Sequence, residues 1–151
     1  MATDSHTQTF FAGQFQHAVD EKNRITIPSR WRSGEPDNFI LLPHPKEEFL
    51  QVMSHEEFAR VITKAESDPN VPAREQRVFL RHLHARAQHG SADKQGRLVL
   101  PEELCKQLAL KGEVTLVGGR GRFEIWNTAK WKQAHKEEKA TYERVADAIG
   151  L

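Results

Sequence analysis

The chain has 151 residues and one cysteine, and its 22 Lys and Arg almost balance its 21 Asp and Glu, which leaves a net charge of +1. This length allows one sizeable core or two small ones, and a nearly neutral chain can bind nucleic acid only if its charges are sorted onto one face. The lone Cys105 excludes an intramolecular disulfide and the zinc motifs built on cysteine pairs, and it fits a reducing compartment.

The sequence carries no signal for secretion or for a membrane. Residues 1–9 are polar and lack the apolar segment of a signal peptide, and no later stretch approaches the roughly 18 apolar residues of a membrane span. We therefore expect a cytoplasmic protein with no membrane partner. Residues 1–10 receive no predicted role.

The first predicted elements are a strand, a turn and a second strand. Residues 14–19 alternate apolar and polar side chains, as a half-buried strand does, and residues 20–23 are typical of a tight turn. Residues 24–27 form a short apolar strand. Pro28 suits the first position of a helix, so a short helix is predicted over residues 29–33.

This pattern occurs twice in the chain. Residues 20–28 (DEKNRITIP) match residues 93–101 (DKQGRLVLP) at an offset of 73 residues, with identical Asp, Arg and Pro. Asn23 and Gly96 occupy the same place in the two copies, and both residue types tolerate a positive φ. The same tight turn is therefore predicted in both copies.

The repeat extends beyond the turn. Residues 50–53 fall against residues 123–126 at the same offset, and residues 39–42 correspond to residues 114–117 if a short gap opens in a loop. Each copy is predicted to contain two strands, a short helix, two further strands and an amphipathic helix.

Three longer helices complete the prediction. Ser54 and Glu57 have the spacing of a capping box, which opens a helix that stops before Pro69. Residues 73–88 carry apolar side chains at helical spacing and link the two copies as a helix. A last amphipathic helix begins at about Ala129.

The predicted fold class is α+β, with two tandem β-rich modules that are each followed by an amphipathic helix. The first module is predicted at residues 11–67 and the second, with the C-terminal helix, at residues 90–147. Residues 68–89 form the linking helical segment. The first module is the one expected to face DNA.

The two turn segments differ in charge. Residues 29–32 are Ser-Arg-Trp-Arg, whereas the equivalent residues 102–105 are Glu-Glu-Leu-Cys, which would repel phosphates. Arginine can bridge guanine O6 and N7 with two hydrogen bonds, and lysine suits a phosphate. The predicted DNA-binding residues are Lys22, Arg24, Arg30 and Arg32.

A second interpretation of the two turn arginines stays open. Arg24 and Arg97 could pair with Asp20 and Asp93 inside their own turns, as structural links that need no ligand. We favour DNA contact for Arg24, because further basic residues follow it without matching acids, and a structural role for Arg97. Arg97→Ala should then affect folding more than DNA binding.

No catalytic, cofactor or metal site is predicted. His82, His84 and His89 do not share one helix face, and no Cys or carboxylate completes a ligand set. The glycine-rich residues 118–122 precede a strand instead of the helix of a phosphate-binding loop, so a hairpin turn is predicted there. Cys105 and the three tryptophans are expected in the core.

The sequence resembles the MraZ family of bacterial transcriptional regulators, whose modules are similar to the AbrB-type swapped-hairpin DNA-binding fold. The resemblance rests on both Asp-x-x-x-Arg turns with their prolines, on residues 11–13, and on residues 114–118 leading into residues 123–126. It covers nearly all of residues 11–147. Its double motif makes the signature specific, since one Asp-x-x-x-Arg turn alone would be weak.

The resemblance implies a tandem double-split β-barrel and a ring, commonly of eight subunits. It also implies binding to short direct repeats in the promoter of the division and cell-wall gene cluster. Family DNA contacts lie on the first turn and its flank, which carries Lys22 and Arg24 over directly and Arg30 and Arg32 less directly. Asn23 departs from the Gly of most relatives, and Ala12 stands where many have a basic residue.

The predicted function is sequence-specific DNA binding in transcription regulation, in which neighbouring faces of a ring engage successive repeats. The predicted partners are double-stranded DNA and further copies of the chain, with no small-molecule substrate. An antitoxin-like protein-interaction module is the alternative, and it would leave an apolar C-terminal segment that orders on its partner. An enzyme is not expected, because no convergent catalytic set is present.

Overall fold

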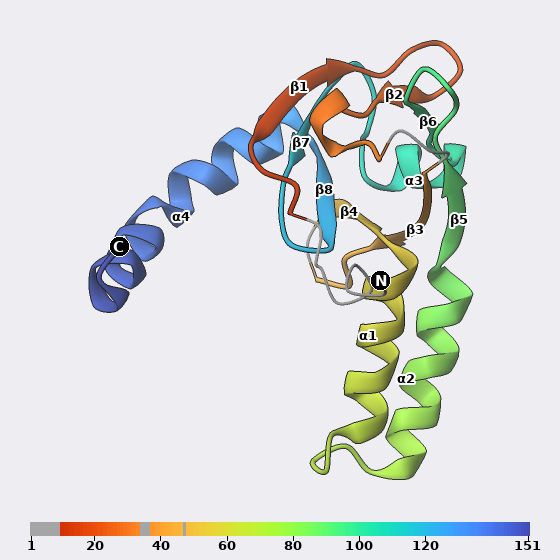
Figure 1. Ribbon diagram of the computed structural model, residues 1–151, viewed down its shortest axis with the longest axis vertical. Helices are drawn as coiled ribbons and strands as arrows, with labels where there is room; N and C mark the ends of the chain where they lie inside the picture. Colours follow the sequence, from red (N-terminus) through yellow and green to blue (C-terminus); the bar gives the residue numbers. More distant parts are fainter. Residues whose placement is uncertain (1–9, 34–36, 47) are drawn as a thin grey trace, which may run out of the picture.

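The computed structural model describes residues 10–33, 37–46 and 48–151, and in this part of the chain it is a mixed α+β structure (Figure 1). The strands are β1 (Gln14–Ala18), β2 (Arg24–Thr26), β3 (Asn38–Pro43), β4 (Phe49–Met53), β5 (Gln88–Ser91), β6 (Arg97–Val99), β7 (Glu113–Val117) and β8 (Arg122–Asn127). The helices are α1 (His55–Ser67), α2 (Ala73–Arg86), α3 (Glu102–Gln107) and α4 (Thr128–Ile149), with a 3-10 helix at Ser29–Trp31. The α+β class predicted from the sequence is confirmed.

Six strands form one antiparallel sheet in the order β1-β7-β8-β4-β3-β5, and β2 and β6 form a separate two-stranded ribbon. β4 and β8 pair at the centre of the sheet, where Leu50 lies opposite Ile125. β1 pairs with β7 and β2 pairs with β6. Strands from the two repeated segments are therefore interleaved, although the segments follow one another in the sequence.

The order of elements also repeats. Two strands, a short helix, two strands and a helix run from β1 to α1 and again from β5 to α4, and α2 connects the two runs. β2 and β6 begin 73 residues apart, as do β4 and β8. The domain boundaries predicted from the sequence follow this repeat and stay a prediction.

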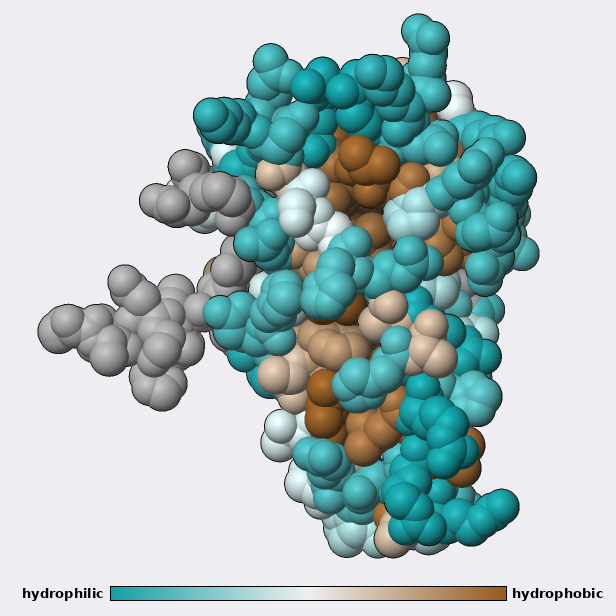
Figure 2. All heavy atoms as spheres, turned by 90° about the vertical axis from the view of Figure 1, so that its right-hand side faces the viewer, coloured by the Kyte–Doolittle hydropathy of each residue, from teal (hydrophilic) through white to brown (hydrophobic). Residues whose placement is uncertain are grey.

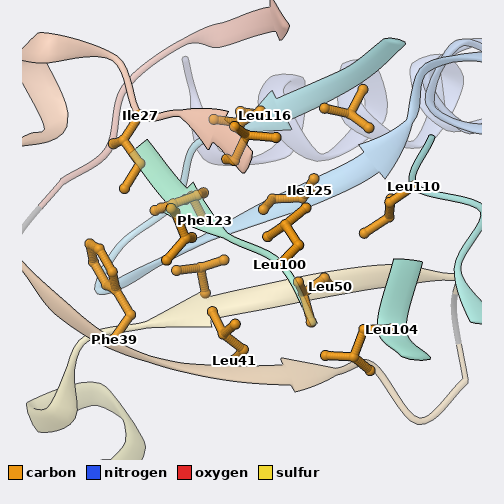
Figure 3. Close-up of a cluster of buried hydrophobic side chains, with 14 of the residues drawn as sticks. Ile27, Phe39, Leu41, Leu50, Leu100, Leu104, Leu110, Leu116, Phe123 and Ile125 are labelled. Carbon is orange, nitrogen blue, oxygen red and sulfur yellow. The ribbon is translucent and has the colours of Figure 1, made fainter. Parts of the chain in front are cut away.

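One hydrophobic core joins the two segments. Among the described residues it contains side chains from Phe11 in the first segment to Ile125 in the second, and Figure 3 shows them meeting between the strands and α3. The ring centroid of Phe123 lies 5.3 Å from Phe11, 5.0 Å from Trp31 and 5.9 Å from Phe39. Each segment therefore buries apolar surface of the other, which holds the interleaved strands together.

The start of α1 follows the sequence prediction only in part. The Ser54 Oγ accepts a hydrogen bond from the N–H of Glu57 at 3.1 Å, as an N-cap does. The N–H of Ser54, however, donates to the carbonyl of Gly121, and the Glu57 carboxylate accepts from Arg122 and Arg60. The reciprocal half of the capping box is absent because the arginines offer the carboxylate charged donors.

The link between the segments ends differently from the prediction. α2 stops at Arg86 instead of continuing to residue 88, and Gln88–Ser91 form the edge strand β5. β5 pairs with β3, where Gly90 lies opposite Phe39. The polar sequence of β5 lacks a strand pattern. It is extended because its backbone pairs with the edge of β3, whose N–H and C=O groups would otherwise be unpaired there.

The helices extend away from the sheet in two directions (Figure 1). α1 and α2 form a hairpin that packs on the sheet through a small second cluster around Leu42, Met53 and Leu83. α4 starts on β7 and β8 and then projects beyond them. None of the helices in the described part of the chain combines the length and the apolar character needed to cross a bilayer.

Two of the three tryptophans are core residues, as predicted. Trp31 and Trp126 are buried, but Trp131 is only partly buried, so its core assignment was wrong. Trp131 packs against Trp126 with ring centroids 5.4 Å apart. It stays partly open because it lies on the first turn of α4, where the helix begins to leave the sheet.

Candidate nucleic-acid interface

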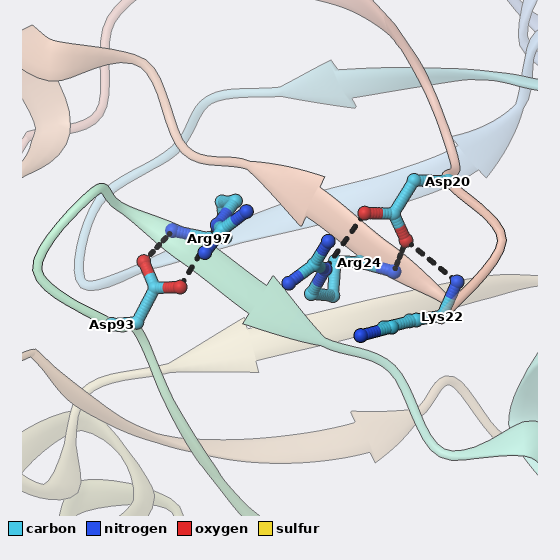
Figure 4. Close-up of polar contacts among 5 residues, drawn as sticks. All are labelled: Asp20, Lys22, Arg24, Asp93 and Arg97. Carbon is cyan, nitrogen blue, oxygen red and sulfur yellow. Dashed lines mark hydrogen bonds and ion pairs between the residues drawn. The ribbon is translucent and has the colours of Figure 1, made fainter.

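The β2-β6 ribbon places the two Asp-x-x-x-Arg turns at opposite ends of one short surface. Its antiparallel register sets Arg24 opposite Val99 and Thr26 opposite Arg97. The central residue of each strand is buried, so the alternation of side chains puts both arginines on the outward face. Figure 4 shows Arg24 and Arg97 along the ribbon between the two turns.

Asp20 holds the first turn together. Its Oδ1 accepts the backbone N–H groups of Lys22 at 2.9 Å and Arg24 at 2.8 Å, and its Oδ2 accepts the Nε–H of Arg24 at 2.7 Å. Asn23 has a φ of 57° and donates its N–H to the carbonyl of Asp20. Asn therefore preserves the turn, as expected, since it tolerates the left-handed region.

Asp93 forms the same contacts in the second turn. Its Oδ1 accepts the N–H groups of Gln95 and Arg97, and its Oδ2 accepts the Nε–H of Arg97, all at 2.9 Å. Gly96 occupies the place of Asn23 with a φ of 79°. The internal arginine–aspartate pair that the sequence left as an alternative is thus present in both copies.

Both turn carboxylates are held in the ionised form. The backbone N–H of Arg24 is the main cause that lowers the pKa of Asp20, and the guanidinium of Arg24 adds to it against a smaller effect of burial. Arg97 lowers the pKa of Asp93 in the same way. Each pair engages the arginine through Nε, and no acceptor for the terminal nitrogens lies among the described residues. The internal pair is therefore compatible with a ligand contact.

Lys22 and Arg30 are exposed. Lys22 lies in the first turn beside Arg24 (Figure 4), and Arg30 lies on the 3-10 helix that follows β2. The structure therefore brings Lys22 and Arg24 together at the first turn.

Arg32 packs on the second turn. A Cβ atom at Gly96 would lie 2.4 Å from the Arg32 Nη1 and 2.6 Å from its Cδ, so this side chain passes directly over the glycine. From the charges, Arg32 was predicted to lie with Lys22, Arg24 and Arg30 on the first copy. In the structure its side chain lies at the second turn instead.

The second turn was assigned a structural role from the sequence, but its geometry matches that of the first. The Arg97 side chain is 35% exposed, compared with 25% for Arg24, and Lys94 is exposed in the same turn. The repeated Asp-x-x-x-Arg spacing was the signal in the sequence that the two turns are alike. The missing information was the β2-β6 pairing, which puts both arginines on one face.

The histidines and the cysteine form no metal site in the part of the chain that the structure describes. Within the described ranges, no group of three or more His, Cys, Asp or Glu is arranged to hold a metal ion. His84 contacts a carbonyl of its own helix, whereas His89 stacks on His55 with ring centroids 6.0 Å apart. Cys105 is buried as predicted, and burial raises the pKa of its thiol.

Comparisons with known proteins find relatives along almost the whole chain. A family model described as "MraZ protein, putative antitoxin-like" matches residues 83–149. A protein from Desulforamulus reducens named transcriptional regulator MraZ is 35% identical over 139 residues, which cover 92% of this chain and 96% of that protein.

Two further relatives carry the same name. One from Acetivibrio thermocellus is 33% identical over 93% of this chain and 97% of its own length. One from Pediococcus pentosaceus is 33% identical over 92% of this chain and 96% of its own length. The names describe regulators of transcription and not enzymes, in agreement with the expectation from the sequence. The chain belongs to the MraZ family.

Proposed function

We propose that this chain is a sequence-specific DNA-binding transcriptional regulator that acts in the cytoplasm on the nucleoid. It is a double-split β-barrel of two tandem modules, and it assembles into a ring of eight copies. The ring binds short direct repeats in the promoter of the division and cell-wall gene cluster, including its own. The residues that contact DNA are Lys22, Arg24, Arg30 and Arg32.

The observation that carries this proposal is the outward position of Arg24 on a stiff ribbon. Its pair with Asp20 fixes the side chain in advance, which lowers the entropy lost on binding, and leaves the terminal nitrogens available. A two-stranded ribbon fits the major groove, where an arginine reads guanine with two hydrogen bonds. Arg24 therefore has the geometry of a base-reading residue, and Lys22 beside it suits a phosphate.

The proposal includes assembly because each ribbon offers few charges. A chain with a net charge of +1 binds DNA weakly through one face, and several linked faces on repeated sites convert weak contacts into tight binding. The distal part of α4 leaves Tyr142 66% and Ile149 73% exposed. An apolar helix face of this kind is typical of a contact with another protein chain, and we assign it to a second copy.

Arg24→Ala tests the function. We expect it to weaken binding to a DNA fragment from the protein's own upstream region by about 10-fold or more, because a guanine contact contributes roughly 1–3 kcal/mol. A gel-shift titration measures the effect. Arg81→Ala is the matched control, since Arg81 is exposed on α2 and is not part of the ribbon. An Arg24→Ala protein that keeps its oligomeric mass and shifts the fragment as well as the parent would contradict the assignment.

The antitoxin-like interaction module stays a second candidate because the same face of α4 could hold an unrelated protein. Footprinting separates the two. Evenly spaced protected repeats upstream of the gene support the regulator. No protection, together with a co-purifying protein that shields Tyr142 and Ile149, supports the interaction module.

A further inference from the structure

The second turn receives a basic side chain from the other repeated segment. The N–H of Ile27, just after β2, donates to the carbonyl of Gly96 at 2.8 Å, so the chain leaving β2 runs beside the second turn. Trp31 is then buried, with its Nε1–H donating to the carbonyl of Ala12 at 3.0 Å. This anchor directs the next residue, Arg32, across Gly96.

Gly96 is needed there for two reasons. Its φ of 79° lies in the left-handed region, and a Cβ atom would meet three atoms of the Arg32 side chain at 2.4–2.6 Å. The first turn has no such arrangement by sequence, because the position equivalent to Arg32 is Cys105, which is buried. The two ends of the ribbon are therefore chemically different.

Arg32 has an unusual environment for a cation. Its Nε is buried without a hydrogen-bond partner, and none of the ion pairs among the described residues includes Arg32. Arg24 and Arg97, in contrast, each have an aspartate partner. A half-buried guanidinium without a carboxylate partner among the described residues favours an additional anion.

The position of Arg32 also changes the charge balance of the ribbon. At the second turn, Lys94, Arg97 and Arg32 lie near two acids: Asp93, and Asp37, whose carbonyl accepts the N–H of Ala92 and whose carboxylate accepts from Ser33. At the first turn, two basic residues face two acids. The tertiary structure thus places the excess of positive charge at the second turn, to which the sequence analysis gave a structural role.

We infer that Arg32 and Lys94 form a phosphate-binding site on the second turn, and that Gly96 is the positioning residue that seats Arg32. The ligand is a backbone phosphate of DNA, so the inference rests on the proposed function and adds a second contact point to it. Phosphate contacts fix the register of a protein on the duplex without reading sequence. The ribbon then reads bases near Arg24 and anchors to the backbone at its other end.

Arg32→Met tests this site in the full-length protein. Methionine keeps much of the apolar stem and removes the charge and the buried Nε, so thermal stability should not fall. Binding is measured over a series of salt concentrations, with the upstream fragment and with a duplex of unrelated sequence. We expect the magnitude of the negative slope of log K against log salt to decrease by about one for each ribbon that engages DNA, on both duplexes.

Arg81→Met makes the same chemical change on α2 and should leave the slope unchanged. Gly96→Ala should reproduce the slope of Arg32→Met by displacing the guanidinium, and combining the two changes should cause no further loss of slope. Even if Gly96→Ala fails to fold, Arg32→Met alone decides the question.

Two results overturn the site: an Arg32→Met protein with the slope of the parent, or an equal decrease for Arg81→Met. If the parent prefers the upstream fragment but its slope does not depend on Arg32, the proposed function stands and the site fails. If the parent does not prefer that fragment, yet Arg32→Met still lowers the magnitude of the slope, the site stands and sequence-specific regulation fails.

Discussion

At the scale of single residues, ion pairs separate the arginines that are available to a ligand from those that hold the fold. Arg122 of β8 donates from Nε and Nη2 to Oε2 of Glu57, at 2.9 and 2.6 Å, and from Nη1 to Oε1 of Gln51. All three guanidinium nitrogens of this arginine have a partner inside the chain, and the side chain joins the start of β8 to α1. The side chains of Arg24 and Arg97 donate to their aspartates through Nε alone.

Glu57→Gln should destabilise the protein in a pH-dependent way. Burial alone would raise the pKa of Glu57, but hydrogen bonds from Arg122 and Arg60 outweigh it and lower the pKa below its ordinary value of 4.5. A lowered pKa in the folded state stabilises the protein above the unfolded value, and this contribution is lost as the pH falls through the folded value. We expect a cost of about 1–2 kcal/mol at pH 7.

Urea unfolding at several pH values measures this effect. The difference between the parent and Glu57→Gln should shrink as the pH falls below 4.5. Glu56→Gln is the control, because Glu56 is an exposed neighbour in the same first turn of α1. A loss that stays constant with pH, or one that Glu56→Gln matches, would show that the Arg122 pair is not the cause.

At the scale of elements, local chemistry predicted the turns and the helix start well. Asn23 and Gly96 both adopt positive φ, and Ser54 caps α1. The end of α2 was predicted wrongly because β5 takes its form from the neighbouring β3 and not from its own sequence. Elements with local hydrogen bonds are readable in the sequence, whereas an edge strand depends on its partner.

Ser54→Ala tests the helix start. Removing the Oγ that accepts the N–H of Glu57 should lower the free energy of unfolding by about 1 kcal/mol. Ser67→Ala, at the other end of α1, removes only a hydroxyl that donates to a carbonyl of its own helix, and it should be near neutral. Equal losses for the two variants in thermal unfolding would contradict the capping role.

At the scale of the whole molecule, the shared core and the projecting α4 have different consequences. The core covers the inner face of the sheet, but the end of α4 keeps an apolar face that the described residues leave open. Figure 2 shows that apolar side chains also reach the surface on the side of the molecule that carries α2 and β5, between hydrophilic ones. We assign the α4 face to contacts between copies.

Ile149→Asp should dissociate the assembly, because it places a charge on the apolar face of α4. Light scattering after size-exclusion chromatography should show a lower mass, while circular dichroism stays unchanged since Ile149 is exposed. The dissociated protein should also bind the upstream DNA more weakly, through loss of multivalency. Ala148→Asp adds the same charge about 100° around the helix and should keep the mass. A monomeric parent, or an Ile149→Asp protein of unchanged mass, would contradict the assignment.

The two turns of the candidate site were predictable from the sequence, but their arrangement on one ribbon was not. The two Asp-x-x-x-Arg turns predict two stiff turns with a basic side chain, and both are present. The charge comparison placed Arg32 with Arg24, because it followed distance along the chain. In the structure Arg32 lies over Gly96, since the buried Trp31 fixes the path of the backbone.

The sequence by itself determined the repeat, the α+β class, the turn geometry and the buried strands, because these follow from side-chain types and spacings of a few residues. Only the tertiary structure decided that β2 pairs with β6 and β4 with β8. These pairings join residues about 70 positions apart, and they depend on the burial of one shared core, which no local pattern encodes. The same pairings set the two turn arginines on one outward face and bring Arg32 to the second turn.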